Sequence, residues 1–163
     1  MMVLCSIREA GHTIFWTRKP DGDAQEHFVA IAVKNCLISR LSEDSKPVNE
    51  RMITPQLPLT QNIYCTLISI YAPIMTNSIE NINQLHAQLN VTLGNISESE
   101  NFVLLGDFNT RVGSDCSSWK SVIRNFGTGK CNSNGEPLLK TCTEHQLVIT
   151  NTYFKHKDGH KHS

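Results

Sequence analysis

The sequence has no long hydrophobic run, no excess of charge of either sign and no closely spaced cysteine pair. No apolar run approaches the roughly eighteen residues that a transmembrane helix needs, so we expect no membrane span. Lys plus Arg (15) equals Asp plus Glu (15), so the formal net charge is +0 and no chain-wide field attracts polyanions. Binding of a nucleic acid would therefore depend on a local basic patch.

Six cysteines are dispersed along the chain without a Cys-x-x-Cys pair. This spacing argues against a zinc site. The N-terminal stretch is too short an apolar run for a signal peptide and lacks a basic start, which argues against a disulfide framework. We expect reduced thiols and an intracellular chain, either cytoplasmic or nuclear.

The length of 163 residues and the hydrophobic content of 39% are those of a globular domain with a sizeable core. Strands are expected where apolar and β-branched residues gather: 12–17, 28–33, 52–57 (weak, interrupted by Pro55 and stopped by Pro58), 63–72, 102–105 and 147–150. Helices are expected at 78–96 and 137–146. Residues 39–49 and 109–134 should be connections, the second with one helical turn near Trp119. A strand, a helix and a strand over 63–105 indicate a βαβ-type connection, either across one sheet or between sheet layers.

The stretch Asn101–Thr110 has the strongest catalytic character. Its apolar run Phe102–Leu105 predicts a central strand buried on both faces, and Gly106 allows another backbone, or a phosphate, to come close. In extended geometry Asp107 and Asn109 would point to the same side. A carboxylate and an amide at the end of a buried strand are typical of a catalytic edge, although a plain polar turn is the alternative interpretation.

Two other patterns carry less weight. Gly127-Thr-Gly-Lys130 fails as a phosphate-binding loop, because Arg124 and Cys131 stand where glycine and a hydroxyl residue are required. The C-terminal histidines could bind a soft metal, but a solvated basic loop is the preferred interpretation: His156, His160 and His162. The lysines of that loop could contact phosphates.

Two motifs together point to a family. Ser69-Ile-Tyr-Ala-Pro73 and Leu104-Leu-Gly-Asp-Phe-Asn109 resemble the endonuclease/exonuclease/phosphatase superfamily. Further stretches resemble its retrotransposon-derived members, the craniofacial development protein 2-like sequences: Phe15-Trp16, Ala32–Asn35, Val48–Met52, Tyr71–Asn77, Gly129–Gly135 and Ile149–Thr152. The resemblance covers essentially the whole chain.

The resemblance implies an incomplete α/β sandwich of the DNase I-like type, with residues 1–163 forming one partial domain. It also implies a Mg²⁺-dependent phosphodiesterase that nicks DNA. In that family Asp107 would orient or deprotonate the attacking water, and Asn109 would steady the water and the phosphate. Tyr71 would stabilise the developing negative charge or the leaving group.

Other family elements do not match. The family's early asparagine strand and metal-binding glutamate would precede this chain, so the metal ligands are not identified; Glu9 matches the segment after that glutamate. The family's catalytic histidine motif would follow Ser163, which stands at a threonine position. Ser163, Lys155 and Lys157 are weak candidates for substrate binding. We therefore expect the chain as given to be inactive or weakly active.

Two alternative functions fit the same residues. One is a non-catalytic module that binds nucleic acid or protein and retains only the fold. The other is a phosphatase that acts on a small phosphoester, because fold alone does not separate these activities.

Overall fold

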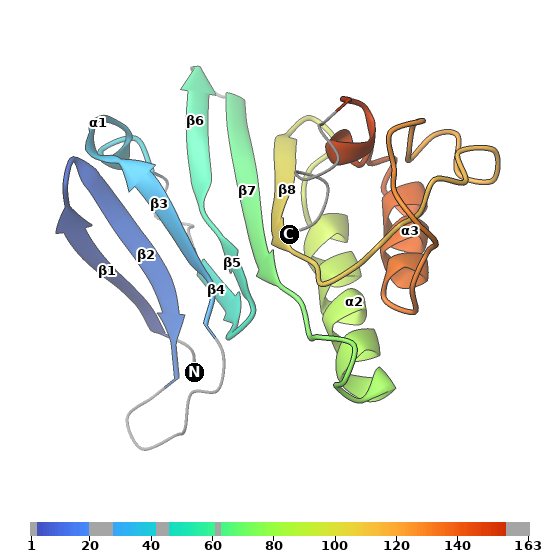
Figure 1. Cartoon of the computed structure of the whole chain (residues 1–163). Helices are drawn as coiled ribbons and strands as arrows, with labels where there is room; N and C mark the ends of the chain where they lie inside the picture. The colour runs from blue at the N-terminus through green and yellow to red at the C-terminus, as the bar shows by residue number, and fades with distance from the viewer. Residues whose placement is uncertain (1–2, 20–27, 42–45, 61–62, 156–163) are drawn as a thin grey trace. The chain divides into compact units, whose positions relative to one another are not determined.

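The computed structural model describes residues 3–19, 28–41, 46–60 and 63–155 (Figure 1). The chain divides into two compact units, residues 1–72 with 96–107, and residues 73–95 with 108–163. The described elements are β1 (Val3–Glu9), β2 (His12–Arg18), β3 (Ala30–Lys34), α1 (Asn35–Ile38), β4 (Lys46–Asn49), β5 (Met52–Thr54), β6 (Gln56–Thr60), β7 (Ile63–Tyr71), α2 (Ile79–Gly94), β8 (Asn101–Asp107), α3 (Gly135–Glu144) and the 3₁₀ helix η1 (Thr150–Thr152).

The first unit contains two sheets. Strands β1, β2 and β3 form an antiparallel sheet in that order. In the second sheet β7 is central: β5 and β6 pair antiparallel with its C-terminal and N-terminal halves, and β8 pairs with it in parallel (Figure 1). The parallel β7–β8 pair, joined through α2, confirms the βαβ connection expected from the sequence.

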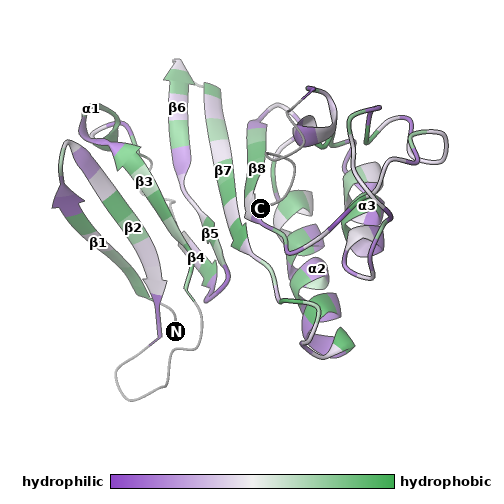
Figure 2. Ribbon diagram, viewed as in Figure 1, coloured by the Kyte–Doolittle hydropathy of each residue, from purple (hydrophilic) through white to green (hydrophobic). Residues whose placement is uncertain are grey.

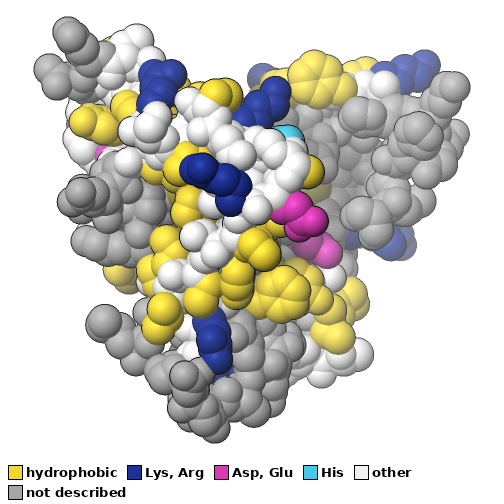
Figure 3. Space-filling model, turned by 90° about the vertical axis from the view of Figure 1, so that its left-hand side faces the viewer, with side chains coloured by type: hydrophobic (Ala, Val, Ile, Leu, Met, Phe, Trp, Pro, Cys, Tyr) yellow, Lys and Arg dark blue, Asp and Glu magenta, His cyan; other side chains and the backbone are white. Residues whose placement is uncertain are grey.

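The first sheet has one buried and one exposed face. Thr13, Thr17 and Val33 are buried, and the Thr17 hydroxyl donates to the carbonyl oxygen of Glu50, 3.3 Å away, in the turn before β5. The strand register places Val3 and Ile7 on the opposite face, where each is about half exposed. Figure 3 views the molecule from the side of β1 and shows hydrophobic side chains on the surface that faces the viewer.

The core of the first unit lies around β7. Ile68, Ile70, Met52 and Ile53 are almost completely buried, and the register pairs Met52 with Ile70. Figure 2 shows the hydrophobic residues of β7 along the strand. Ile68 and Ile70 lie on one face of β7 and the buried Cys65 lies on the other, so the strand has apolar residues on both faces, as its sequence predicts.

The second unit is built from helices and loops. Ser78 caps α2 by accepting from the Asn81 backbone, and one apolar stripe of the helix is buried: Ile82, Leu85, Leu89 and Leu93. A second buried cluster joins α3 to the preceding loop: Val122, Ile123, Leu138, Leu139 and Cys142. The backbone of Val122 and Ile123 donates to Trp119, which forms the single turn predicted there.

The prediction that residues 102–105 form a strand buried on both faces is wrong. Strand β8 forms, but Val103 is 48% exposed and Leu105 is 36% exposed. Among the described residues β8 pairs only with β7, so it is an edge strand and lacks the second neighbour that would cover it. The apolar run indicated a strand correctly but not its place in the sheet.

Three other expectations need correction. Residues 46–49 of the expected connection form β4, which pairs with β5. Pro58 does not stop a strand but lies within β6, because β6 pairs only with β7 in the described part of the chain and an edge strand tolerates proline. Residues 147–150 are not a strand: the backbone of Leu147 and Ile149 donates to Cys142 and Val122 instead. Strand β1 and helix α1 were not predicted.

The structure thus has mixed α/β content with two sheets, which is compatible with an α/β sandwich. Within the described ranges, no helix is both long enough and apolar enough to cross a membrane.

Candidate functional site

Tyr71 and Asp107 occupy the same register position at the carboxyl ends of β7 and β8. Residues in register on parallel strands project from the same face of the sheet, so the phenol and the carboxylate are neighbours on one face. Beyond them the backbone of Ala72 donates to the carbonyl oxygen of Asp107 over 2.8 Å. Tyr71 is 36% exposed and Asp107 is also exposed, so a solute can reach both side chains.

Gly106 brings the two strand ends close together. It has a φ of +131°, and a Cβ built on it would lie 1.9 Å from the carbonyl oxygen of Ile70. Only glycine fits this backbone conformation and this approach. The expectation that Gly106 admits a neighbouring backbone is therefore confirmed.

Arg51 is a residue of this site that sequence reasoning did not single out. Its guanidinium lies 5.9 Å from the centroid of the Tyr71 ring, and its Nη1 donates to the Tyr71 carbonyl oxygen over 3.3 Å. The Tyr71 backbone in turn donates to the Arg51 carbonyl oxygen over 3.0 Å. The signal was the antiparallel pairing of β5 with β7, since the Met52–Ile70 pair places the preceding arginine opposite Tyr71.

Asn109 belongs to the second unit, two residues beyond Asp107 in the chain. Its φ of +48° lies in the left-handed region, which asparagine tolerates better than most residues. The extended backbone ends at Asp107, so the expectation that both side chains point to one side by strand alternation is wrong. Within the second unit, Asn134 Nδ2 donates to the carbonyl oxygen of Asn109 over 3.2 Å.

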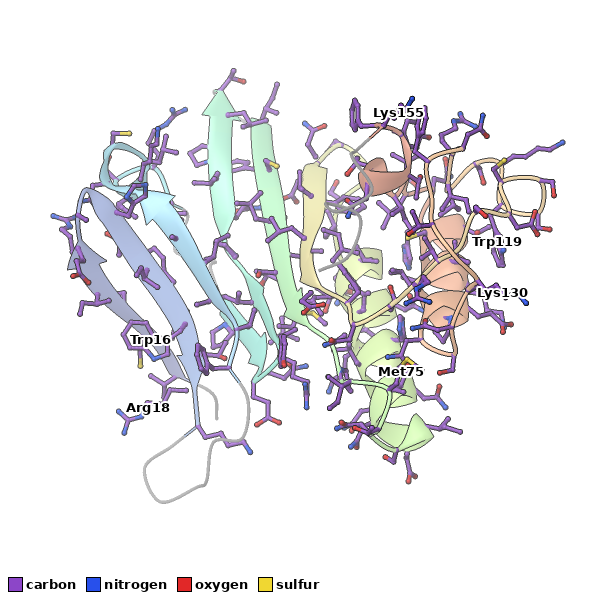
Figure 4. The ribbon with its side chains drawn as sticks, viewed as in Figure 1. Trp16, Arg18, Met75, Trp119, Lys130 and Lys155 are labelled. Carbon is purple, nitrogen blue, oxygen red and sulfur yellow. The ribbon has the colours of Figure 1, made fainter. Side chains whose placement is uncertain are left out.

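The other predicted site residues are not brought to this sheet edge. Lys155 is exposed beyond η1 in the second unit (Figure 4), whereas Lys157 and Ser163 lie outside the described residues, as do the C-terminal histidines. Glu9 is exposed at the end of β1, paired in register with His12. Lys130 of the rejected phosphate-loop pattern is also exposed.

The described residues do not form a complete magnesium site. No group of three or more His, Cys, Asp or Glu side chains that could hold a metal occurs among residues 3–19, 28–41, 46–60 and 63–155. Asp107 offers one carboxylate, and Mg²⁺ in proteins is bound through one or two carboxylates together with waters and substrate phosphates. The present donors are therefore too few for a site made by protein side chains alone.

The fold and this sheet edge define a class of protein: a mixed α/β chain with a carboxylate, a phenol and a guanidinium together where two parallel strands end. A carboxylate can orient or deprotonate water, and a phenol and a guanidinium can donate to an anionic oxygen. This donor set fits chemistry on an anionic group such as a phosphate.

The chain is similar to craniofacial development protein 2 of Bos taurus, with 29% identity, and of Tragulus javanicus, with 27% identity, each over 107 residues. Each alignment covers 66% of this chain, which spans only 18% of the relative's length. No known protein-family profile matches the chain, and no solved structure matches it. The similarity supports a family relationship between this chain and craniofacial development protein 2 and nothing more specific.

Proposed function

We propose that the chain carries part of a phosphodiesterase site of the DNA-endonuclease kind at the carboxyl ends of β7 and β8. The observation that carries the proposal is the Tyr71–Asp107 pair in register on adjacent parallel strands. Arg51 adds a positive charge beside the same tyrosine. The resemblance of the Tyr-Ala-Pro and Gly-Asp-Phe-Asn motifs to the endonuclease/exonuclease/phosphatase superfamily supports the choice of a phosphodiester.

Each residue has a role that its chemistry allows. Asp107 orients the attacking water and accepts its proton, because an exposed carboxylate is an acceptor in its ionised form. Tyr71 donates to an oxygen on which negative charge develops, and Arg51 binds a phosphate oxygen. Asn109 steadies the water or the phosphate through its side-chain amide.

Mg²⁺ is part of the proposal because the resemblance implies it. When bound, such an ion neutralises charge on the phosphate. Asp107 is assigned to the water, and we assign no protein ligand of the ion among the described residues. Because the described donors are few, we expect weak turnover from the chain as given.

Nicking of supercoiled plasmid with and without Mg²⁺ tests the proposal. The parent chain should nick slowly and only with Mg²⁺, and Asp107→Asn should abolish this. Tyr71→Phe should lower the rate about a hundredfold, the scale of losing one donor to a developing charge. Glu98→Gln, which neutralises an exposed carboxylate in a turn of the same unit, is the matched control and should nick like the parent.

Other outcomes separate the alternatives. Salt-dependent DNA binding without cleavage, unaffected by Asp107→Asn, would favour a non-catalytic nucleic-acid module. Hydrolysis of a small phosphomonoester without nicking would favour a phosphatase. Nicking that survives Asp107→Asn would contradict the proposed site.

A further inference from the structure

Asn134 is a buried asparagine at the start of α3 whose side chain does not make the hydrogen bond expected at that position. It is 2% exposed and lies at the N-cap of α3, the position where asparagine commonly caps a helix. Its side chain makes no capping hydrogen bond there. Asn132 takes that role instead, because its Oδ1 accepts from the backbone of Gly135 over 2.9 Å.

The Asn134 amide is directed at two other segments of the second unit. Nδ2 donates to the carbonyl oxygens of Pro73 and Asn109, each over 3.2 Å. Pro73 lies two residues beyond the end of β7, and Asn109 lies two residues beyond the end of β8. One buried amide therefore ties together the two segments that leave the strand ends of the candidate site.

Such a restraint favours the observed conformation of Asn109. A non-glycine residue at a φ of +48° has a higher free energy than in the ordinary regions, although the cost is smaller for asparagine than for most residues, and a surrounding contact can offset this cost. The direction of its side chain depends on this backbone conformation. A hydrogen bond to its own carbonyl oxygen fixes that backbone directly.

The neighbouring glycine allows Asn134 to come this close. A Cβ on Gly135 would lie 2.3 Å from the carbonyl oxygen of Arg111 and 2.7 Å from the sulfur of Cys131. The start of α3 is therefore packed directly against the segment that follows Asn109. Asn134 thus supplies the hydrogen-bond donor, and Gly135, which has no side chain, leaves room for the two segments to pack closely.

We propose that Asn134 is a positioning residue, which holds Asn109 in its left-handed conformation and so fixes the direction of the Asn109 side-chain amide, the group that the proposed function assigns to the phosphodiester. The inference rests on the proposed function for the role of Asn109. The restraint itself is independent of catalysis and can be measured without turnover.

NMR of the isotope-labelled chain tests the restraint. In the parent, the couplings and carbon shifts of Asn109 should report a positive φ, and the Asn134 side-chain amide protons should exchange slowly with solvent. Asn134→Leu removes the donors at similar volume. Asn134→Asp turns both donor contacts into oxygen–oxygen repulsion without changing the shape.

Both variants should lose the positive φ at Asn109. Asn90→Leu is the matched control. In both Asn90 and Asn134, Nδ2 donates a hydrogen bond (from Asn90 to Glu144) and Oδ1 is buried without a hydrogen-bond partner among the described residues of the same unit. It should leave Asn109 unchanged. If either Asn134 variant stays folded with Asn109 at positive φ, the inference is wrong.

If both Asn134 variants unfold, the test is made on the parent protein by measuring the exchange of its Asn134 side-chain amide protons. Fast exchange of the Asn134 amide protons in the folded parent would then overturn the inference, and slow exchange would uphold the restraint. Where the parent nicks DNA, Asn134→Leu should lower kcat on the order of a hundredfold, since small misplacements of a site residue have such effects. If the parent never nicks DNA, the proposed function is contradicted. The NMR measurement of the Asn109 φ still shows whether Asn134 restrains that residue.

Discussion

The backbone of Gly106 lies against the carbonyl group of Ile70 so closely that no side chain fits between them. Gly106→Ala should therefore lower the free energy of unfolding by at least about 2 kcal/mol, because the variant adds both a clash and a strained φ. Chemical denaturation measures the change.

Gly94→Ala is the control for that substitution. A Cβ at Gly94 meets nothing within 4 Å, and the residue ends α2, so alanine should be neutral or slightly stabilising. Equal stability of Gly106→Ala and Gly94→Ala would contradict the close approach.

A hydrogen-bonded cluster at the other end of the sheet should stabilise β6, β7 and β8 together. Gln56 Nε2 and Thr66 Oγ1 both donate to Glu100 Oε1. Glu100→Ala should lower the free energy of unfolding by about 1–3 kcal/mol, because it leaves two part-buried donors without this acceptor. Glu98→Ala, at an exposed position two residues earlier, should change it by less than about 0.5 kcal/mol. A cost for Glu98→Ala equal to that for Glu100→Ala would argue against the cluster.

His86 should make the second unit sensitive to acid. Burial between α2 and α3 lowers the pKa of His86 below its ordinary value of 6.5, and its Nδ1 lies 3.3 Å from Thr141 Oγ1. The unfolded chain then binds this proton more readily than the folded chain. The neutral imidazole therefore makes its full contribution to the free energy of unfolding above about pH 6.5. This contribution decreases as the pH falls toward the lowered pKa of His86.

Urea denaturation at a series of pH values checks this dependence. His86→Gln should weaken the decrease in stability below pH 6.5, and His12→Gln, at an exposed histidine, is the control substitution. An identical pH profile for His86→Gln and the parent would show that His86 is not responsible.

Cysteine reactivity should follow burial. Burial raises the pKa of Cys142 to about 11 from 9.0, so the reactive thiolate is about a hundredfold scarcer than for an ordinary thiol. Cys36 is exposed. Alkylation followed by mass spectrometry should therefore label Cys36 in the folded protein and Cys142 only after denaturation. Early labelling of Cys142 would contradict the packing of α3.

The sequence predicts those elements whose pattern is local. The apolar stripe of α2, the two-sided strand β7 and the βαβ order follow from spacing alone, and so does the need for Gly106. The edge position of β8 could not be predicted, because a strand buried on both faces and an apolar edge strand have the same residues. Pro58 and residues 147–150 were misread because sheet position and contacts with α3 outweigh local propensity.

The candidate site was predictable only in part. Tyr71 and Asp107 stand at recognisable motifs, but their neighbouring register depends on pairing between segments separated by α2. Arg51 and Asn134 have no local signal, since each acts through contacts with residues far away in the chain. The left-handed Asn109 is a conformation that its neighbours impose and that strand alternation does not show.

Binding of a phosphodiester at the ends of β7 and β8 can be measured directly by NMR titration of the labelled chain with a thymidine dinucleotide that contains one phosphodiester, with thymidine as the control. The amide signals of Tyr71, Ala72 and Asp107 and the side chain of Arg51 should shift with the dinucleotide and not with thymidine. Shifts confined to other residues, or no shifts at millimolar concentrations, would contradict binding at these strand ends.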